Sequence, residues 1–202
     1  MTSVAIFDYG AGNIFSLKTS LEKAGATVDV ITNFDKPNGY SGLLLPGVGN
    51  FDPAVKSITE SSKIKFKEYV KDGTPVLGIC LGMEMFFEKS QEGKEKGLKI
   101  MNGEVIILPD SMKVPHMGWN DLEIKRPGKI LQGVDNGAWV YFVHSYRVKP
   151  NSNDIITAEA DYGIKVPAVV EQDNFFGTQF HPEKSGSVGK IMINNFLDVC
   201  KR

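Results

Sequence analysis

The sequence predicts an α/β fold with a mostly parallel central sheet flanked by helices, and an additional antiparallel sheet in the second half. In the first half of the chain, short apolar runs alternate with segments of helical periodicity. Those runs are apolar throughout, as is typical of strands covered on both faces. The second half changes to strand-like segments joined by turns. No linker or internal repeat interrupts the pattern, so we expect residues 1–202 to form a single domain.

The first half alternates four expected strands with three expected helices. The strands are 3–8, 27–32, 42–47 and 75–79. Apolar residues spaced by three or four predict a helix that begins near Ile14 and stops at Gly25. A second helix is expected over 52–72, and a third begins just after Cys80.

The second half is expected to contain five strands, several of them paired antiparallel, and a final helix. The strands are 103–108, 138–143, 154–160, 168–172 and 175–180. The final helix covers about 186–200, where apolar residues recur at helical spacing.

Composition excludes several classes of protein. A net charge of -1 and the lack of a basic run give no indication of nucleic-acid binding. The longest apolar runs are too short to span a bilayer, and the N-terminus lacks the basic segment of a signal peptide. Two cysteines, Cys80 and Cys200, form no disulfide framework. We therefore expect reduced thiols in a cytoplasmic protein.

Cys80 stands between two glycines where a strand is expected to meet a helix. Gly78-Ile79-Cys80-Leu81-Gly82 has the spacing of a nucleophile elbow. A sharp strand-to-helix turn leaves no room for side chains two residues away on either side, which favours glycine there. The turn would expose the sulfur at a helix N-terminus, where the thiolate is favoured. The alternative is a packed core cysteine with incidental glycines.

A thiol nucleophile needs a base, and His181 is the best candidate among three histidines. Pro182 disfavours helix at His181. In an extended segment Glu183 would project to the same side as His181 and could orient the imidazole. Alternatively, His-Pro-Glu is an ordinary surface turn. Together with the elbow, the sequence predicts a triad of Cys80, His181 and Glu183.

The loop after the third strand is the candidate source of an oxyanion hole. Gly47 and Gly49 allow the backbone around Val48 to approach a ligand closely. The N–H of Leu81 would be the other donor. Alternatively, the glycines merely give a turn its flexibility.

These motifs, in this order, resemble those of the class I (triad-type) glutamine amidotransferases. The segments that show this resemblance are "PGVG", "GICLGM" and "FHPEKS". Within the class the chain resembles the glutaminase subunits of imidazole glycerol phosphate synthase, which act in histidine biosynthesis. The segments "DYGAGNIFSL", "PGVGNF", "PHMGWN" and "YFVHSYR" narrow the resemblance, which covers the full length. It implies a flavodoxin-like fold.

The resemblance also implies a reaction and a partner. Cys80 would attack the side-chain amide of glutamine, His181 would protonate the departing ammonia, and water would then release glutamate. Ammonia would pass to a separate cyclase subunit, a (β/α)8 barrel, in a heterodimer. The residues implied to face that subunit are Tyr9 to Asn13 and Met117 to Asn120, Trp119 among them. Trp119 could equally be a core aromatic. Ser145 and Tyr146 are implied contacts to the glutamine substrate.

One residue departs from the family pattern. The family usually has glutamine where this chain has Glu84, on the same helical face as Cys80. An ionised glutamate only accepts hydrogen bonds, and its charge would raise the thiol pKa. Glu84 is therefore turned away, paired with a cation such as the substrate ammonium, or present in a slower glutaminase. We favour pairing, with Glu84 in the substrate site.

Other functions are less well supported. "YGAGN" lacks the third glycine of a dinucleotide motif, because Phe15 stands there, and no Cys/His cluster suggests zinc. We expect no metal and no cofactor. The alternatives are a sister amidotransferase subunit, of anthranilate synthase or pyridoxal phosphate synthase type, another cysteine hydrolase with the same elbow, or a flavodoxin-like binding subunit with an inactive triad.

Overall fold

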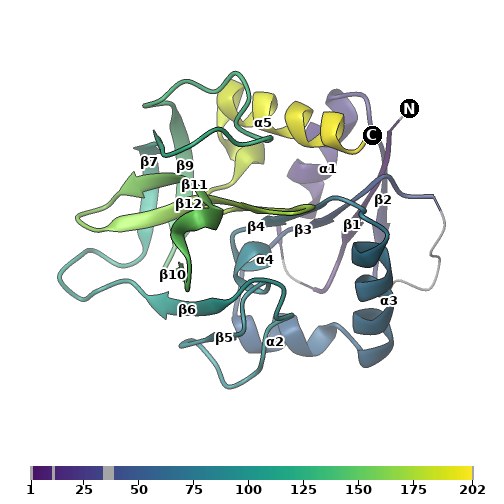
Figure 1. Ribbon diagram of the computed structural model, residues 1–202, viewed down its shortest axis with the longest axis horizontal. Coiled ribbons are helices and arrows are strands. Elements are labelled where there is room, and N and C mark those ends of the chain that lie inside the picture. Colours follow the sequence, from purple (N-terminus) through teal and green to yellow (C-terminus); the bar gives the residue numbers. More distant parts are fainter. Residues whose placement is uncertain (1, 11, 34–38, 202) are drawn as a thin grey trace.

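The computed structural model describes residues 2–10, 12–33 and 39–201, which are built around an eight-stranded sheet (Figure 1). Its strand order is β2-β1-β3-β4-β13-β12-β11-β8. The first five strands are parallel: β2 (Thr27–Ile31), β1 (Ser3–Phe7), β3 (Gly42–Leu45), β4 (Val76–Ile79) and β13 (Phe175–Thr178). The last three continue the sheet antiparallel: β12 (Lys165–Gln172), β11 (Ile156–Asp161) and β8 (Glu123–Ile124). The mostly parallel sheet is therefore confirmed.

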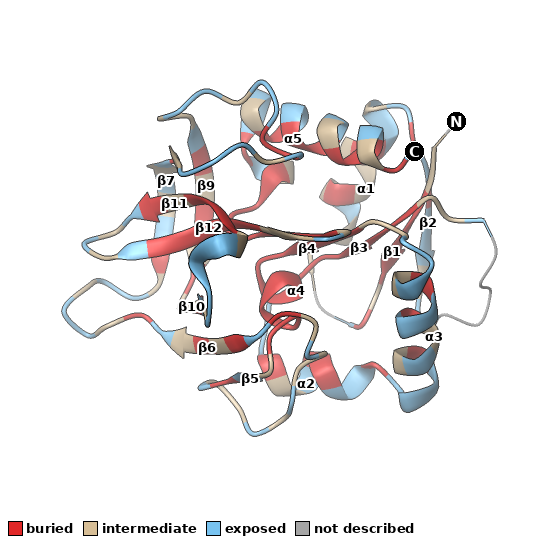
Figure 2. Cartoon of the chain, viewed as in Figure 1, coloured by how far each residue is buried: buried red, intermediate tan, exposed pale blue. Residues whose placement is uncertain are grey.

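Helices cover both faces of the sheet, and the sheet separates two apolar cores (Figure 2). On one face lie α1 (Ile14–Lys23) and α5 (Gly186–Val199), which contribute Leu17, Leu21 and Phe196 to the first core. On the other face lie α2 (Phe51–Ser57), α3 (Glu60–Lys71) and α4 (Leu81–Glu84). Double coverage explains why the central strands are continuously apolar.

Two small sheets lie beside the main one, and the sequence pattern missed three of their five strands, β5, β7 and β10. One joins β10 (Tyr146–Pro150), β6 (Gly103–Ile107) and β5 (Lys89–Ser90). The other pairs β7 (His116–Asp121) with β9 (Trp139–His144) antiparallel. β7 lacks the expected pattern because His116 is buried while Met117 and Trp119 are exposed. In an ordinary surface strand the apolar side chains face the interior and the polar ones face solvent, and β7 shows the reverse.

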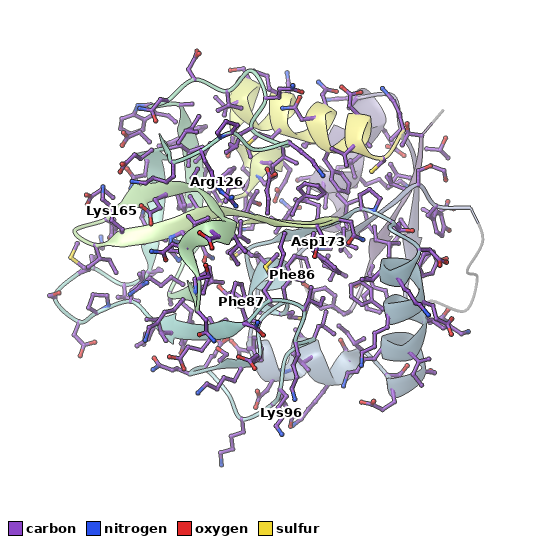
Figure 3. All side chains as sticks on the ribbon, viewed as in Figure 1. Phe86, Phe87, Lys96, Arg126, Lys165 and Asp173 are labelled. Carbon is purple, nitrogen blue, oxygen red and sulfur yellow. The ribbon has the colours of Figure 1, made fainter. Side chains whose placement is uncertain are left out.

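Two helix predictions were wrong in extent. The helix expected over 52–72 is divided into α2 and α3, because Ile58 is extended and the Thr59 side chain accepts from Ser62 N–H to cap α3. The helix expected after Cys80 is the single turn α4. Phe86 and Phe87 follow it and are fully buried in the interior (Figure 3). The strand expected from 154 begins instead with a 3-10 turn, Asn153–Ile155.

The carboxyl ends of four parallel strands meet at one edge of the sheet. Leu45 of β3 pairs with Gly78 of β4, and Ile79 of β4 pairs with Thr178 of β13. The loops that follow β1, β3, β4 and β13 therefore share one rim, the usual location of sites in α/β sheets. Across the described ranges, no helix has the length and apolar character needed to cross a membrane.

Candidate active site

Cys80 occupies a strained turn between β4 and α4. Its φ of 52° and ψ of −111° lie in a region that non-glycine residues rarely adopt. A Cβ on Gly78 would lie 2.7 Å from the Gly82 carbonyl carbon, and a Cβ on Gly82 would collide with the Leu45 carbonyl oxygen. The steric reason for the two flanking glycines is thus confirmed, and the residue between them forms an elbow.

Cys80 lies in the wall of a cavity of about 310 Å³, and only 6% of the residue is exposed. Its Sγ donates to the Val143 carbonyl at 3.9 Å and accepts from Gln179 Nε2 at 3.7 Å. Burial and then the Glu84 carboxyl raise the pKa of the thiol well above its usual value, against the lowering effect of the Leu81 N–H. The expectation of a thiolate favoured at a helix N-terminus was wrong, because α4 is one turn long and the sulfur is desolvated.

His181 and Glu183 form a buried hydrogen-bonded pair. His181 Nδ1 lies 2.9 Å from Glu183 Oε1, with side chains 2% and 3% exposed. His181 is extended, and Pro182 opens a 3-10 turn, Pro182–Lys184, that brings the carboxylate back to the ring. Ser185 fixes the segment, since its hydroxyl donates to the His181 carbonyl and accepts from Tyr141 N–H. A carboxylate at Nδ1 keeps the proton there and leaves Nε2 as the acceptor.

The nucleophile and the base follow adjacent parallel strands. Cys80 N–H donates to the Thr178 carbonyl at 2.7 Å, three residues before His181. His181 Nε2 is buried and has no hydrogen-bond partner among the described residues, so Cys80 Sγ and this nitrogen are not hydrogen-bonded. Sulfur instead contacts the Gln179 amide. Catalytic hydrogen bonds of this type are often long before substrate binds.

Glu84 faces the cavity rather than turning away. It is 4% exposed and lines the cavity beside Cys80. Its Oε1 accepts from Gln179 Nε2 at 3.2 Å. Burial raises the pKa of Glu84 to about 8, helped by the nearby Glu92 carboxyl and opposed by Gln179. The carboxyl is thus neutral at pH 7 and can donate as well as accept.

The candidate oxyanion loop borders the same cavity. Val48, Gly49 and Leu81 line it, and Gly49 has a φ of 122° that favours glycine. Gly47 does not line the cavity: a Cβ there would lie 2.5 Å from Leu81 Cβ. It permits close packing of the loop behind the elbow.

Tyr9 was expected to face a partner, and this is wrong. It is only 7% exposed, and its hydroxyl would lie 2.6 Å from a Cβ on Gly47. The phenol oxygen is buried and has no hydrogen-bond partner within residues 2–10, 12–33 and 39–201, and burial raises its pKa well above the ordinary value. Asn13 is half-buried at the N-cap of α1, and the neighbouring residue 11, also within the predicted partner segment, lies outside the described residues.

The remaining predicted residues divide between the cavity and the surface. Ser145 and Tyr146 line the cavity. Met117 is 63% exposed and Trp119 52%, so Trp119 is not a core residue. Asn120 is half-buried in the same strand, β7.

Sequence reasoning missed Gln179 and Ser185. Gln179 is fully buried and contacts both Cys80 and Glu84. Two-residue periodicity could have indicated it, since Gln179 and His181 project to the same side of an extended segment. Among the described residues no cluster of three His, Cys, Asp or Glu side chains could hold a metal ion. A larger cavity of about 790 Å³ beside α3 contains lysines and apolar side chains, but neither a cysteine nor a histidine.

Comparison with known proteins assigns this fold and site to a class. The model of the family described as "Glutamine amidotransferase class-I" matches residues 5–200. The likeness extends to the PurLQS structure from Thermotoga maritima, with a TM-score of 0.78 at 17% identity, covering 98% of each chain. That likeness supports the fold alone. The elbow cysteine and the His–Glu pair lie on the scaffold of a class-I glutamine amidotransferase.

Sequence relatives narrow the class to one family. The chain is 44% identical to the imidazole glycerol phosphate synthase subunit HisH of Geobacillus thermodenitrificans, covering 98% of this chain and 97% of the relative. It is also 44% identical to the HisH subunit of Archaeoglobus fulgidus, covering 98% and 100%. Within the class-I glutamine amidotransferases, this chain therefore belongs to the HisH family of imidazole glycerol phosphate synthase subunits.

Proposed function

We propose that this chain hydrolyses glutamine to glutamate and ammonia through Cys80, and delivers the ammonia to a cyclase subunit for histidine biosynthesis. The observation that carries the proposal is the placement of a strained elbow cysteine and a buried His181–Glu183 pair at the ends of adjacent parallel strands. We also propose that residues 1–202 act as one domain, in the cytoplasm, without a cofactor or metal.

The first step is proton transfer from Cys80 to His181. The thiol is protonated at rest because burial raises its pKa. His181 holds its own proton on Nδ1 against Glu183, so Nε2 accepts the thiol proton as sulfur attacks the amide carbon of glutamine. Glu183 stabilises the imidazolium that forms. His181 then gives the proton to the leaving nitrogen, which departs as ammonia.

The tetrahedral intermediate carries a negative oxygen that needs donors. The Leu81 N–H lies beside the sulfur, and the backbone of Val48 and Gly49 borders the same cavity. Each such donor is worth roughly 3 kcal/mol of barrier. Water then cleaves the thioester, with His181 as base, to release glutamate. The glycines at 47 and 49 permit a backbone change that completes the oxyanion hole when partner and ligand bind.

The cavity fits a small polar substrate. Ser145 and Tyr146 form one wall and Glu84 another. A substrate α-ammonium beside Glu84 would lower the pKa of this carboxyl and draw it into an ion pair.

The cyclase would dock on the exposed face of β7 and β9. Met117 and Trp119 project from this face, and Trp119 stacks edge-on against Tyr141 at 6.1 Å. Trp139 is 57% exposed. Large exposed aromatic and Met side chains are enriched at protein interfaces.

The test measures glutamate and ammonia released from glutamine, with and without the cyclase subunit and its nucleotide ligand. Turnover should rise by orders of magnitude when both are added. Cys80→Ala should abolish release, and a glutamine-like diazo ketone should label Cys80 in the wild type. Pull-down against the acceptor subunits of sister amidotransferases is the specificity control. Release of ammonia with no response to the cyclase would refute the assignment of partner.

A further inference from the structure

Two buried histidines outside the proposed triad lie between the exposed face of β7 and the substrate cavity. His116 begins β7 and is 3% exposed, and His144 ends β9 and is 5% exposed. The two residues pair across the strands. Neither has a part in the mechanism above. Burying a polar ring costs desolvation free energy that an apolar residue would avoid, so two buried histidines call for an explanation.

The hydrogen bonds of the pair determine where each proton lies. His144 Nδ1 lies 2.7 Å from the Tyr146 carbonyl oxygen, which can only accept, so Nδ1 carries the proton. Burial lowers the pKa of His144 to about 3, so the ring is neutral and its Nε2 is a bare acceptor. His116 Nδ1 lies 2.9 Å from that nitrogen and must be the donor.

The chain of hydrogen bonds continues from His116 toward the surface. Burial lowers the pKa of His116 to about 4, so its ring is also neutral and its Nε2 accepts. Asn120 Nδ2 lies 3.4 Å from this nitrogen and also donates to the Asp161 carbonyl at 2.9 Å. The donors therefore all point one way, from Asn120 through His116 and His144 to the Tyr146 carbonyl.

Aromatic packing holds in place this chain of hydrogen bonds from Asn120 to the Tyr146 carbonyl, which we call the relay. The His116 ring stacks on Tyr162, with centroids 3.9 Å apart and planes at 20°, and on Phe142, at 4.6 Å and 18°. A ring stacked on both faces cannot rotate without repacking its neighbours. Its Nδ1 therefore presents a fixed donor to His144.

The two ends of the relay differ in character. At one end, β7 presents Met117 and Trp119 to solvent on the face opposite His116. At the other, His144, Ser145 and Tyr146 are consecutive residues that all line the cavity containing Cys80. Two rings thus connect the exposed strand to the substrate wall.

We propose that His116 and His144 are positioning residues for glutamine hydrolysis: their hydrogen-bond chain fixes the Tyr146 carbonyl and thereby the wall that holds glutamine. This inference rests on the proposed function of the cavity. Neither ring touches the reacting atoms. Loss of the chain loosens the 144–146 segment, so it weakens glutamine binding more than it slows the chemical step.

Matched substitutions at His144 separate its two nitrogens. An asparagine amide can replace Nδ1 and a glutamine amide can replace Nε2. His144→Asn keeps the donor to the Tyr146 carbonyl, whereas His144→Gln loses it. In the complex with the cyclase, His144→Gln should raise the KM for glutamine about tenfold, as expected for one lost buried hydrogen bond, with kcat changed less than threefold. His144→Asn should recover most of the affinity.

A second pair tests the upstream ring. His116→Phe preserves stacking on Tyr162 but removes the donor, and His116→Asn restores a donor at the Nδ1 position. We expect KM to rise in the first variant and to recover in the second. Native KM values in both His144→Gln and His116→Phe would overturn the proposal.

A third measurement needs no variant to be active. Long-range proton–nitrogen NMR of the histidine-labelled wild-type chain at pH 7 reports which ring nitrogen is protonated. Both His116 and His144 should be protonated at Nδ1, and an Nε2-protonated His144 would overturn the relay even if every variant misfolds. If the wild-type complex releases no ammonia, the proposed function fails, while the NMR result still decides the relay.

Discussion

Glu84→Gln should stabilise the fold, and by more at pH 7 than at pH 5. The folded state raises the pKa of Glu84 from 4.5 to about 8, mainly through burial. Because the folded state holds the proton more tightly, the stabilisation is fully present below about pH 4 and is lost as pH rises toward 8. At pH 7 the lost stability is about 3 kcal/mol, against about 1 kcal/mol at pH 5. A neutral amide removes this dependence and still accepts from Gln179.

Urea unfolding at pH 5 and pH 7 measures the effect. The stability advantage of Glu84→Gln over the wild type should be larger at pH 7 by about 2 kcal/mol. Glu68→Gln, on an exposed position of α3, is the control and should change stability by less than about 0.5 kcal/mol at both pH values. An advantage of equal size at the two pH values would refute the reasoning, because it would mean that Glu84 does not titrate between them.

The same variant tests the substrate role of Glu84. If the carboxylate pairs with the substrate ammonium, Glu84→Gln should raise the KM for glutamine and alter the pH dependence of turnover. The measurement is kcat and KM from pH 6 to 9 in the complex. Unchanged affinity together with an unchanged pH profile would exclude pairing.

Three further substitutions test individual contacts of the fold, each by urea unfolding. Gly82→Ala forces a Cβ onto the Leu45 carbonyl and should cost more than about 3 kcal/mol; a stable, active variant would contradict the elbow geometry. Tyr9→Phe removes a buried hydroxyl that has no partner in the part of the chain that the structure describes, and it should stabilise the fold by about 1 kcal/mol, whereas destabilisation would reveal a bond to that oxygen. Thr59→Ala removes the N-cap acceptor of Ser62 N–H and should lower the free energy of unfolding by about 1 kcal/mol. An unchanged free energy of unfolding would mean that water replaces the Thr59 hydroxyl as the acceptor.

The central sheet was predictable because its strands are apolar on both faces and alternate with helices of clear periodicity. The expected strands at 3–8, 42–47 and 75–79 correspond to β1, β3 and β4. β7 was not predictable in this way, since His116 points inward and Trp119 outward. Its inward residues are polar because they form hydrogen bonds with other segments, and no local pattern encodes such partners.

Local spacing could predict the elbow and the His181–Glu183 contact, because each depends on residues within a few positions. The Gln179 contact to Cys80 joins residues 99 positions apart, so it required the pairing of β4 with β13. The protonation state of Cys80 was also beyond reach: a helix N-terminus argued for the thiolate, but burial and Glu84 prevail. The prediction that Tyr9 faces a partner failed for a related reason. Its position after β1 does not reveal that its side chain packs beside Gly47.

The protonated, nearly enclosed sulfur of Cys80 has a consequence for the durability of the protein. Peroxide oxidises thiolates rather than thiols, and oxidation to sulfinic acid is irreversible in most proteins. With its pKa raised and only 6% of the residue exposed, Cys80 presents little thiolate to such oxidants at neutral pH. The raised pKa and the burial of Cys80 thus protect its sulfur from oxidation at neutral pH, and oxidative inactivation should accelerate only when a bound ligand draws the proton away.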